Sequence, residues 1–289
     1  MSWFNLLLLG AIWGASYMFI KIGGAEIPPF TFVEIRTLVA AIVLMVVLQM
    51  RGEKFPRTRQ AWLVLIALGI FNGVIPYTLI TWGETHISSG LASILTAATP
   101  LFTAIFAHYS MHDERFTLAK ILGITISFGG VVVLFIPELL NGIQIEFWGQ
   151  FAIVVAAASY AIATVIARKF ATGISHYVAP TGQLLTSAVI MLPLSLAFDN
   201  PLALRPSLPA VGSLLILALL GTAFAYILYY WLIEHTGATR TALVTYLIPI
   251  TGVMWGALLL SEPIEWEAIL GLVLIIGGVV LVNRPNAKQ

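Results

Sequence analysis

Two stretches of this chain are nearly the same, and they lie half a chain apart. Residues 121–133 read ILGITISFGGVVV, and residues 269–281 read ILGLVLIIGGVVL. The matching residues keep a single offset, in the pairs Gly123/Gly271, Gly129/Gly277, Gly130/Gly278 and Glu114/Glu262. Solenoid repeats recur every ~20–50 residues, so this much longer period indicates two copies of one large unit. We therefore predict two units, residues 1–140 and 141–289.

The composition places both units in a membrane. Of the 289 residues, 60% are hydrophobic and only 9% are charged, whereas soluble domains carry roughly 25% charged residues. The absence of cysteine excludes disulfides, thiolate catalysis and Cys-ligated metals. A formal net charge of +1 gives no sign of a nucleic-acid partner. No basic residue precedes the first apolar stretch, so we expect a retained first span rather than a cleaved signal peptide.

Ten stretches are long and apolar enough to cross a bilayer as helices. A transmembrane helix needs roughly 20 mostly apolar residues, and short polar links separate the stretches. We therefore predict an all-α integral membrane protein with ten transmembrane helices. The predicted spans are residues 3–23, 30–50, 60–81, 87–110, 117–136, 147–167, 177–197, 210–233, 240–260 and 265–282.

The charged residues predict how these helices are oriented. Basic residues gather in links that share one side: Arg51, Lys54, Arg57, Arg59, Arg115, Lys120, Arg168, Lys169, Arg240, Arg284 and Lys288. The other side carries Lys21, Arg205 and many acids: Glu26, Glu84, Glu138, Glu146, Asp199, Glu262, Glu265 and Glu267. Lys and Arg mark cytoplasmic links, so we expect both termini to be cytoplasmic.

The repeat and the span count together predict inversion. Each unit holds five spans, and five is odd, so the second unit enters the membrane from the opposite side. The two units are then inverted five-helix repeats related by an axis in the membrane plane. Such an axis places a pocket near the midplane and allows an inward-open and an outward-open state.

Two prolines lie at equivalent places in the two units. Pro100 and Pro249 fall near the centres of spans 4 and 9. A proline inside a helix frees the carbonyl four residues earlier, here that of Thr96 or Thr245. One interpretation is a pair of kinked helices that line a pathway and present free carbonyls. The alternative is a pair of packing helices whose threonine hydroxyls satisfy their own backbone.

Aromatic and hydroxyl-bearing residues also lie deep in several spans. Many are too far from the interface to belong to the aromatic belt. They predict a wide central cavity; the alternative is interhelical hydrogen bonding, worth only about 0.6–2 kcal/mol per bond. The candidate substrate-binding residues are Trp13, Tyr17, Asn72, Tyr77, Thr96, Thr99, Ser159, Tyr160, Tyr226, Tyr230, Thr245 and Tyr246.

Arg36 is the most costly of the intramembrane residues. It lies about six residues into span 2, roughly 9 Å below the boundary at 1.5 Å per residue. Its counterpart in the second unit is the neutral Gln183. Intramembrane ionisable residues are candidates for function, so Arg36 is interpreted as a gate or an anchor for a substrate carboxylate. The alternative is an arginine that extends to the surface or ties helix ends together.

The sequence carries no acid at mid-depth in any span, which argues against proton coupling through a buried carboxylate. It also lacks HExxH, GxSxG, Walker A and GxGxxG motifs. We therefore expect no catalytic residue, no metal, no cofactor and no enzyme activity.

The duplicated tails, the Pro100 and Pro249 helices and the arginine of span 2 together resemble the drug/metabolite transporter superfamily. The similarity is to its EamA-type bacterial exporters with ten helices and covers essentially the whole chain. The aromatic-rich lining is similar to the branch that exports aromatic amino acids. Pro100, Pro249, Arg36 and Gln183 are then candidates for gating and kinking.

The resemblance implies a multi-pass protein of the bacterial inner membrane that exports small amphiphilic metabolites by alternating access. Aromatic and other neutral amino acids are the first expectation, while drugs, cationic amphiphiles and other metabolites stay open. A non-transporting membrane scaffold is the alternative from another class. The expected partners are a small-molecule substrate and the lipid bilayer, and the sequence leaves both monomer and homodimer open.

Overall fold

The computed structural model describes residues 2–111 and 116–283, and every regular element among them is a helix. Eight helical segments are long and apolar enough to cross a membrane, and two more, Val244–Leu260 and Trp266–Val282, have 17 residues each. Glu114, Arg115, Arg284 and Lys288 lie outside the described residues. The chain is therefore a multi-pass helical membrane protein.

Several predicted spans consist of more than one helical element. The uninterrupted ones are α1 (Ser2–Gly24), α2 (Pro29–Met50), α7 (Leu118–Asn141), α8 (Ile145–Phe170) and α14 (Trp266–Val282). The interrupted ones are α3 (Arg59–Gly69), η1 (Ile70–Val74) and α4 (Ile75–Glu84); α5 (Ser89–Thr96) and α6 (Thr99–Ser110); α9 (Val178–Leu194) and η2 (Ser195–Asp199); α10 (Leu208–Ile216), η4 (Leu217–Phe224) and α11 (Ala225–Thr236); α12 (Ala238–Thr241) and α13 (Val244–Leu260). A short 3₁₀ turn, η3 (Pro201–Ala203), follows η2. The hydrocarbon core of a bilayer has no water to hydrogen-bond the backbone. The segments therefore stay helical on both sides of each break, which pairs their N–H and C=O groups.

One end of the bundle, here called the acidic face, gathers the links 25–28, 85–88, 142–144, 200–207 and 261–265. Glu26 in the first link bonds Ser207 in the fourth, and Lys21 reaches the carbonyl of Ile87. Glu262 in the last link bonds the start of α5. The opposite end, the basic face, brings the links 51–58 and 171–177 together around a common hollow.

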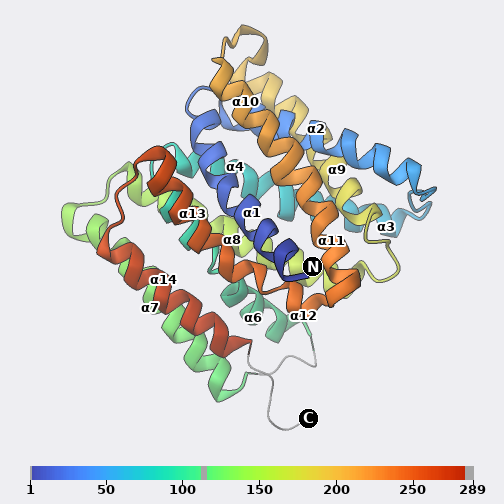
Figure 1. The fold of residues 1–289 in the computed structure, drawn as a ribbon. Coiled ribbons are helices and arrows are strands. Elements are labelled where there is room, and N and C mark those ends of the chain that lie inside the picture. The colour runs from blue at the N-terminus through green and yellow to red at the C-terminus, as the bar shows by residue number, and fades with distance from the viewer. Residues whose placement is uncertain (1, 112–115, 284–289) are drawn as a thin grey trace.

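The duplicated segments form a helix pair beside the main bundle, where α7 and α14 lie side by side (Figure 1). Gly123 packs against Gly278, and Gly130 packs against Gly271. Residue numbers therefore rise along one helix as they fall along the other, so the two run antiparallel. Glycine lets the backbones approach closely, and Ser127 uses the gap to donate its hydroxyl to the carbonyl of Ile275 at 3.2 Å.

The remaining helices contact one another across the two halves of the sequence. α1 packs against α13, and α2 packs against α9. α8 packs in the same way against α4 and α6. Because each of these pairs joins one half of the chain to the other, the halves share a continuous core. Helices from both halves therefore surround the centre of the bundle.

The proline helices differ from the sequence prediction in one respect. In span 4 the break falls at residues 97–98, and Pro100 sits in the first turn of α6, where a missing N–H costs little. The carbonyl of Thr96 is not free, because it accepts the Thr99 hydroxyl at 2.7 Å. In span 9 the break falls at residues 242–243, ahead of Pro249, which is buried inside α13.

Candidate functional site

Spans 3 and 8 contain π-helical stretches at equivalent places, and these open the backbone at the centre of the bundle. η1 begins at Ile70 and η4 at Leu217. In span 3, Pro76 cannot donate to the ladder, and the Phe71 carbonyl accepts the Ser159 hydroxyl of α8 at 2.8 Å. π-bulges within α-helices are frequent at functional sites. Nothing in the sequence analysis indicated them, although Pro76 was a usable signal.

Arg36 points into this opened region rather than to the surface. Its side chain is only 6% exposed. Nε donates to the Thr222 hydroxyl of η4 at 3.0 Å. The guanidinium carbon lies 3.8 Å from the centroid of the Tyr77 ring, within the range of a cation–π contact. Arg36 thus joins α2 to spans 3 and 8.

Thr222 explains why η4 departs from α-helical geometry. Its hydroxyl donates to the carbonyl of Leu217, five residues earlier, at 3.0 Å. A side chain that inserts into the helical ladder bends or widens the helix. The hydroxyl is therefore held in place on one side by Leu217 and receives Arg36 on the other.

A second group of polar side chains adjoins the arginine. Asn72 of η1 donates Nδ2 to Gln183 Oε1 and to the Tyr226 hydroxyl, both at 3.2 Å. Gln183 of α9 donates Nε2 to the same hydroxyl at 2.8 Å. Residues predicted from separate spans are thus brought into one network. We call Arg36, Asn72, Tyr77, Gln183, Thr222 and Tyr226 the central polar cluster.

Further aromatic candidates surround this cluster. The Tyr160 ring of α8 stands edge-on to Tyr77 at 6.5 Å. Tyr17 is 8% exposed and belongs to the main apolar core. The Tyr230 ring stacks on Tyr226 at 6.4 Å and on His176 at 5.6 Å. The row from Tyr226 to His176 leads from the cluster to the link before α9.

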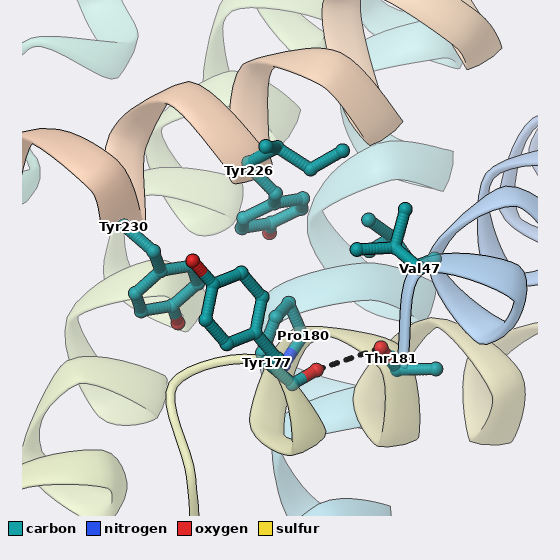
Figure 2. A pocket seen from close by; sticks show the side chains of 8 residues that line it. Val47, Tyr177, Pro180, Thr181, Tyr226 and Tyr230 are labelled. Atoms are coloured by element: carbon teal, nitrogen blue, oxygen red, sulfur yellow. Dashed lines mark hydrogen bonds between the residues drawn. The ribbon is translucent and has the colours of Figure 1, made fainter. Parts of the chain in front are cut away.

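A small cavity adjoins this row, with a volume of about 10 Å³. Figure 2 shows the rings of Tyr177, Tyr226 and Tyr230 facing one another around it, with the Tyr177 carbonyl accepting the Thr181 hydroxyl. Beside the small cavity, the amides of Asn72 and Gln183 bond to each other and to the Tyr226 hydroxyl across the bundle. The wide central cavity that the sequence predicts stays a prediction.

A larger cavity of about 530 Å³ lies at the basic face. Its walls come from the link between α2 and α3 and from the link between α8 and α9. The lining side chains include Glu53, Lys54, Gln60, Lys169 and Ser175. The hollow ends at Val178 of α9, and Pro180 and Thr181 of the same helix line the small cavity beside Tyr226. The basic face is therefore the hollowed end of the bundle.

Other predicted site residues lie away from the cluster. Trp13 packs against Tyr229 at 5.4 Å in the apolar core between α1 and α11. The Tyr246 hydroxyl accepts Asn283 Nδ2 at 2.8 Å near the end of α14. The hydroxyls of Thr96 and Thr245 bond to carbonyls of their own chain segments, Ala92 and Ala242, at 2.8 Å each.

A metal site has no support within the described ranges 2–111 and 116–283. No group of three or more His, Cys, Asp or Glu side chains there could hold a metal ion. The chemistry available at the centre is a buried guanidinium, amides and phenol rings. Such a set suits a small molecule with an anionic group and an apolar or aromatic body.

The chain is similar to known transporters over most of its length. The sequence profile of the EamA-like transporter family matches residues 1–136 and again residues 147–284. The uncharacterized transporter YoaV of Bacillus subtilis is 27% identical over 277 residues, which cover 96% of this chain and 94% of the relative. The uncharacterized inner membrane transporter YedA of Escherichia coli K12 is 28% identical over 285 residues, covering 96% and 89%.

One further relative has a name that includes a substrate class. The "Probable terminal-alkyne amino-acid exporter" of Streptantibioticus cattleyicolor is 28% identical over 284 residues, covering 96% of this chain and 92% of the relative. A solved structure described as "Crystal structure of protein" has a TM-score of 0.69 at 17% identity and covers 98% of this chain and 96% of its own. That likeness concerns the fold alone.

Proposed function

This chain belongs to the EamA-like transporter family, and we propose that it is a secondary carrier that exports small amphiphilic metabolites. Aromatic and other neutral amino acids are the substrates we put first. The observation that carries this proposal is the buried Arg36 guanidinium, bonded to Thr222 and stacked on Tyr77. It offers a charged donor for a carboxylate beside phenol rings that suit an apolar side chain.

The proposal includes an inverted repeat with ten spans, one repeat in residues 1–140 and the other in 141–289. Two observations support it. The equivalent helices α7 and α14 run antiparallel. Gly123 packs against Gly278, and its counterpart Gly271 packs against Gly130, so each contact has an equivalent in the other unit. The π-helical stretches also recur at equivalent places in spans 3 and 8. A twofold axis in the membrane plane relates two such units.

We further propose that the basic face is cytoplasmic, in a bacterial inner membrane, because Lys and Arg mark cytoplasmic links. The cavity at the basic face and the cross-linked acidic face then describe an inward-open state. A substrate would enter through the hollow near Lys169 and Val178. It would pass the tyrosine row beside Pro180 to reach Arg36, and the small cavity there would have to widen as the rings move.

Flux measurements in proteoliposomes test the substrate class. We expect saturable, protein-dependent uptake of labelled phenylalanine, tryptophan or leucine, reduced by unlabelled competitors. Vesicles without protein and vesicles with Arg36→Lys provide the controls. If no neutral amino acid shows saturable flux while a cationic amphiphile does, the amino-acid assignment fails and a drug-exporting carrier is supported. If none of the tested compounds moves, the carrier proposal itself fails.

A further inference from the structure

Glu84 is a carboxylate that the bundle buries without a hydrogen-bond partner. The residue ends α4, and its side chain is 1% exposed. Within the described part of the chain, neither of its carboxylate oxygens has a partner. By its place in the sequence Glu84 belongs to the acids of one side of the membrane, and no acid is predicted at mid-depth in any span. Its neighbours in three dimensions, rather than its place near the end of a span, take it out of water.

A buried carboxylate of this kind is costly when it is ionised. Moving an unpaired charge out of water costs several kcal/mol, and such a group takes up a proton instead. Thr81, one turn earlier in α4, is 0% exposed, and its hydroxyl oxygen has no partner among the described residues. In the described ranges 2–111 and 116–283, no side chain donates a hydrogen bond to the Glu84 carboxylate.

Several elements place charges or titratable groups around Glu84. Lys21 of α1 donates Nζ to the backbone carbonyls of Glu84 and Ile87 at 2.6 and 2.8 Å, so its ammonium is held beside the acid. Charge interactions also reach Glu84 from Arg36 of α2 and from Glu262 in the link before α14. Because these groups carry charges of opposite sign, their movement changes how readily Glu84 binds a proton.

The other elements near this point contribute little charge. α8 packs against α4, with Gly149 touching Gly83, and presents the neutral Gln150, which is 1% exposed. The His86 ring in the neighbouring link stands edge-on to Trp82 at 4.8 Å. Among the described residues, the titratable side chains that interact with Glu84 are Lys21, Arg36, Glu262 and Tyr17. The adjoining elements also carry His86, Glu34, Glu146 and Tyr160.

At the acidic face, carboxylates accept hydrogen bonds from helix starts in other elements. Glu26 accepts hydrogen bonds from the Ser207 backbone N–H and hydroxyl at 2.7 and 2.6 Å. Asp199 accepts the Thr31 N–H at 2.6 Å. Glu262 accepts the N–H groups of Ser89 and Gly90 at 2.8 and 3.1 Å. These contacts join links from both halves of the chain.

We propose that Glu84 is a proton-binding site and that protonation of Glu84 favours closure of the acidic face over it. The inference deepens the proposed carrier function, on which its role in transport rests, by naming the proton as the coupled ion. When the face opens, water reaches Glu84 and the carboxylate can ionise. If the acidic face is the outer one, Glu84 takes up one proton there and the face closes. The proton then leaves toward the basic face as substrate binds, and the ionised carboxylate favours reopening of the acidic face, so that substrate moves outward in exchange for the proton.

The absence of cysteine from the chain allows a direct test by thiol labelling. Ile27 lies in a link of the acidic face and is 2% exposed, so Ile27→Cys reports whether this face is closed. Ala25 is exposed in the same link, so Ala25→Cys corrects for the pH dependence of thiol chemistry. We expect the ratio of the two labelling rates to fall as pH is lowered, by up to about tenfold per pH unit for one linked proton.

Variants then show which side chain binds the proton. In a Glu84→Gln background the ratio should stay low at every pH, because the neutral amide permits closure. Glu138→Gln, an acid of α7 with a carboxylate oxygen likewise without a described partner, and His86→Gln should titrate like the parent. If Glu84→Gln does not fold, Lys21→Met should extend the low labelling ratio to higher pH, since the ionised acid loses its nearby cation. Lys21→Arg should leave the profile unchanged.

If the capping carboxylates alone responded to pH, the labelling ratio would change with pH in the opposite direction. Protonation of Glu26, Asp199 or Glu262 would weaken closure, so labelling would rise as pH falls. That result, or an unchanged titration in Glu84→Gln, overturns the proton site, as does closure driven by sodium at constant pH. The labelling needs no substrate. A predicted titration without amino-acid flux would therefore reject the proposed substrate alone, and flux with a flat titration would reject the proton site alone.

Discussion

The Nε of Arg36 donates to the hydroxyl of Thr222 at 3.0 Å, across a distance of 186 residues in the sequence. The contact joins an uninterrupted helix of the first half to a π-helical stretch of the second. It holds the guanidinium over Tyr77 at the centre of the bundle. A movement of either half therefore changes the position of the one charged donor in the central polar cluster.

If Arg36 anchors a carboxylate, Arg36→Lys should raise the apparent substrate constant about 10- to 100-fold. Lysine keeps the charge but loses the planar donor set and the Nε bond to Thr222, and bonds to charged groups are worth about 1.5–3 kcal/mol. Thr222→Val is the matched variant, because it removes the acceptor and leaves the arginine. Concentration-dependent flux gives both constants. An unchanged constant with poor folded yield would assign Arg36 a structural role.

Tyr226→Phe should destabilise the protein by about 1–3 kcal/mol, because it leaves amide donors of Asn72 and Gln183 without their shared acceptor. Thermal unfolding in detergent measures the loss. Tyr229→Phe is the control, since Tyr229 packs through its ring against Trp13. Equal midpoints for the two variants would contradict the hydrogen-bonded network.

Pro249→Ala and Pro100→Ala should each slow transport more than they lower folded yield. Pro249 keeps its segment from forming a complete ladder, and its carbonyl lies 3.4 Å from the Ser93 hydroxyl of α5. A restored helix would resist the bending that alternating access requires. Flux per folded molecule, compared with yield by size-exclusion chromatography, separates the two effects. Parallel losses of flux and yield would favour a packing role.

Gly130→Leu and Gly278→Leu should lower folded yield sharply, whereas Gly129→Leu and Gly277→Leu should not. A side chain at Gly130 or Gly278 meets the backbone of the facing helix, while Gly129 and Gly277 have nothing within 4 Å. Overpacking costs typically 1–3 kcal/mol. Fluorescence-detected chromatography of the four variants measures the difference. Similar yields for all four would contradict the close approach of α7 and α14.

Hydrogen bonds from the hydroxyl and N–H of Ser207 hold the pKa of Glu26 below its ordinary value. A depressed folded pKa gives stability that is present above the ordinary glutamate pKa, about 4.3, and lost as pH falls through the lower folded value. The difference in melting temperature between the parent and Glu26→Gln should therefore be constant near neutral pH and shrink only in strong acid. A difference that already vanishes near neutral pH would contradict the contact.

The part of the fold that could be predicted is the part that depends on apolar runs and repeated segments of the sequence. The spans and links follow from apolar runs, because lipid leaves a chain little choice but a helix. The family assignment, confirmed by the profile match over both halves, rests on the same duplicated segments. The ends of the predicted spans differ from the observed helices by a few residues, since caps such as Thr58 and Ser88 extend or trim the first turn.

The candidate site was predictable residue by residue only in part. Four of the predicted residues meet at the centre: Arg36, Asn72, Gln183 and Tyr226. Each could be predicted because a polar side chain inside a span is costly. Tyr246 carries the same signal, yet its hydroxyl meets Asn283 at the end of α14. Depth along a helix can be counted in a sequence, but the direction in which a side chain points depends on how neighbouring helices rotate and cross.

By itself the sequence determined a helical membrane protein of two related halves, because hydrophobicity and repetition are properties of the chain read in order. The tertiary structure alone decided which of the central residues bond to one another. It also decided that the Glu84 carboxylate, near the end of a span, is buried with no hydrogen-bond partner among the described residues. Burial and hydrogen bonding depend on contacts between distant segments, such as α4 with α8, and no local pattern encodes those contacts.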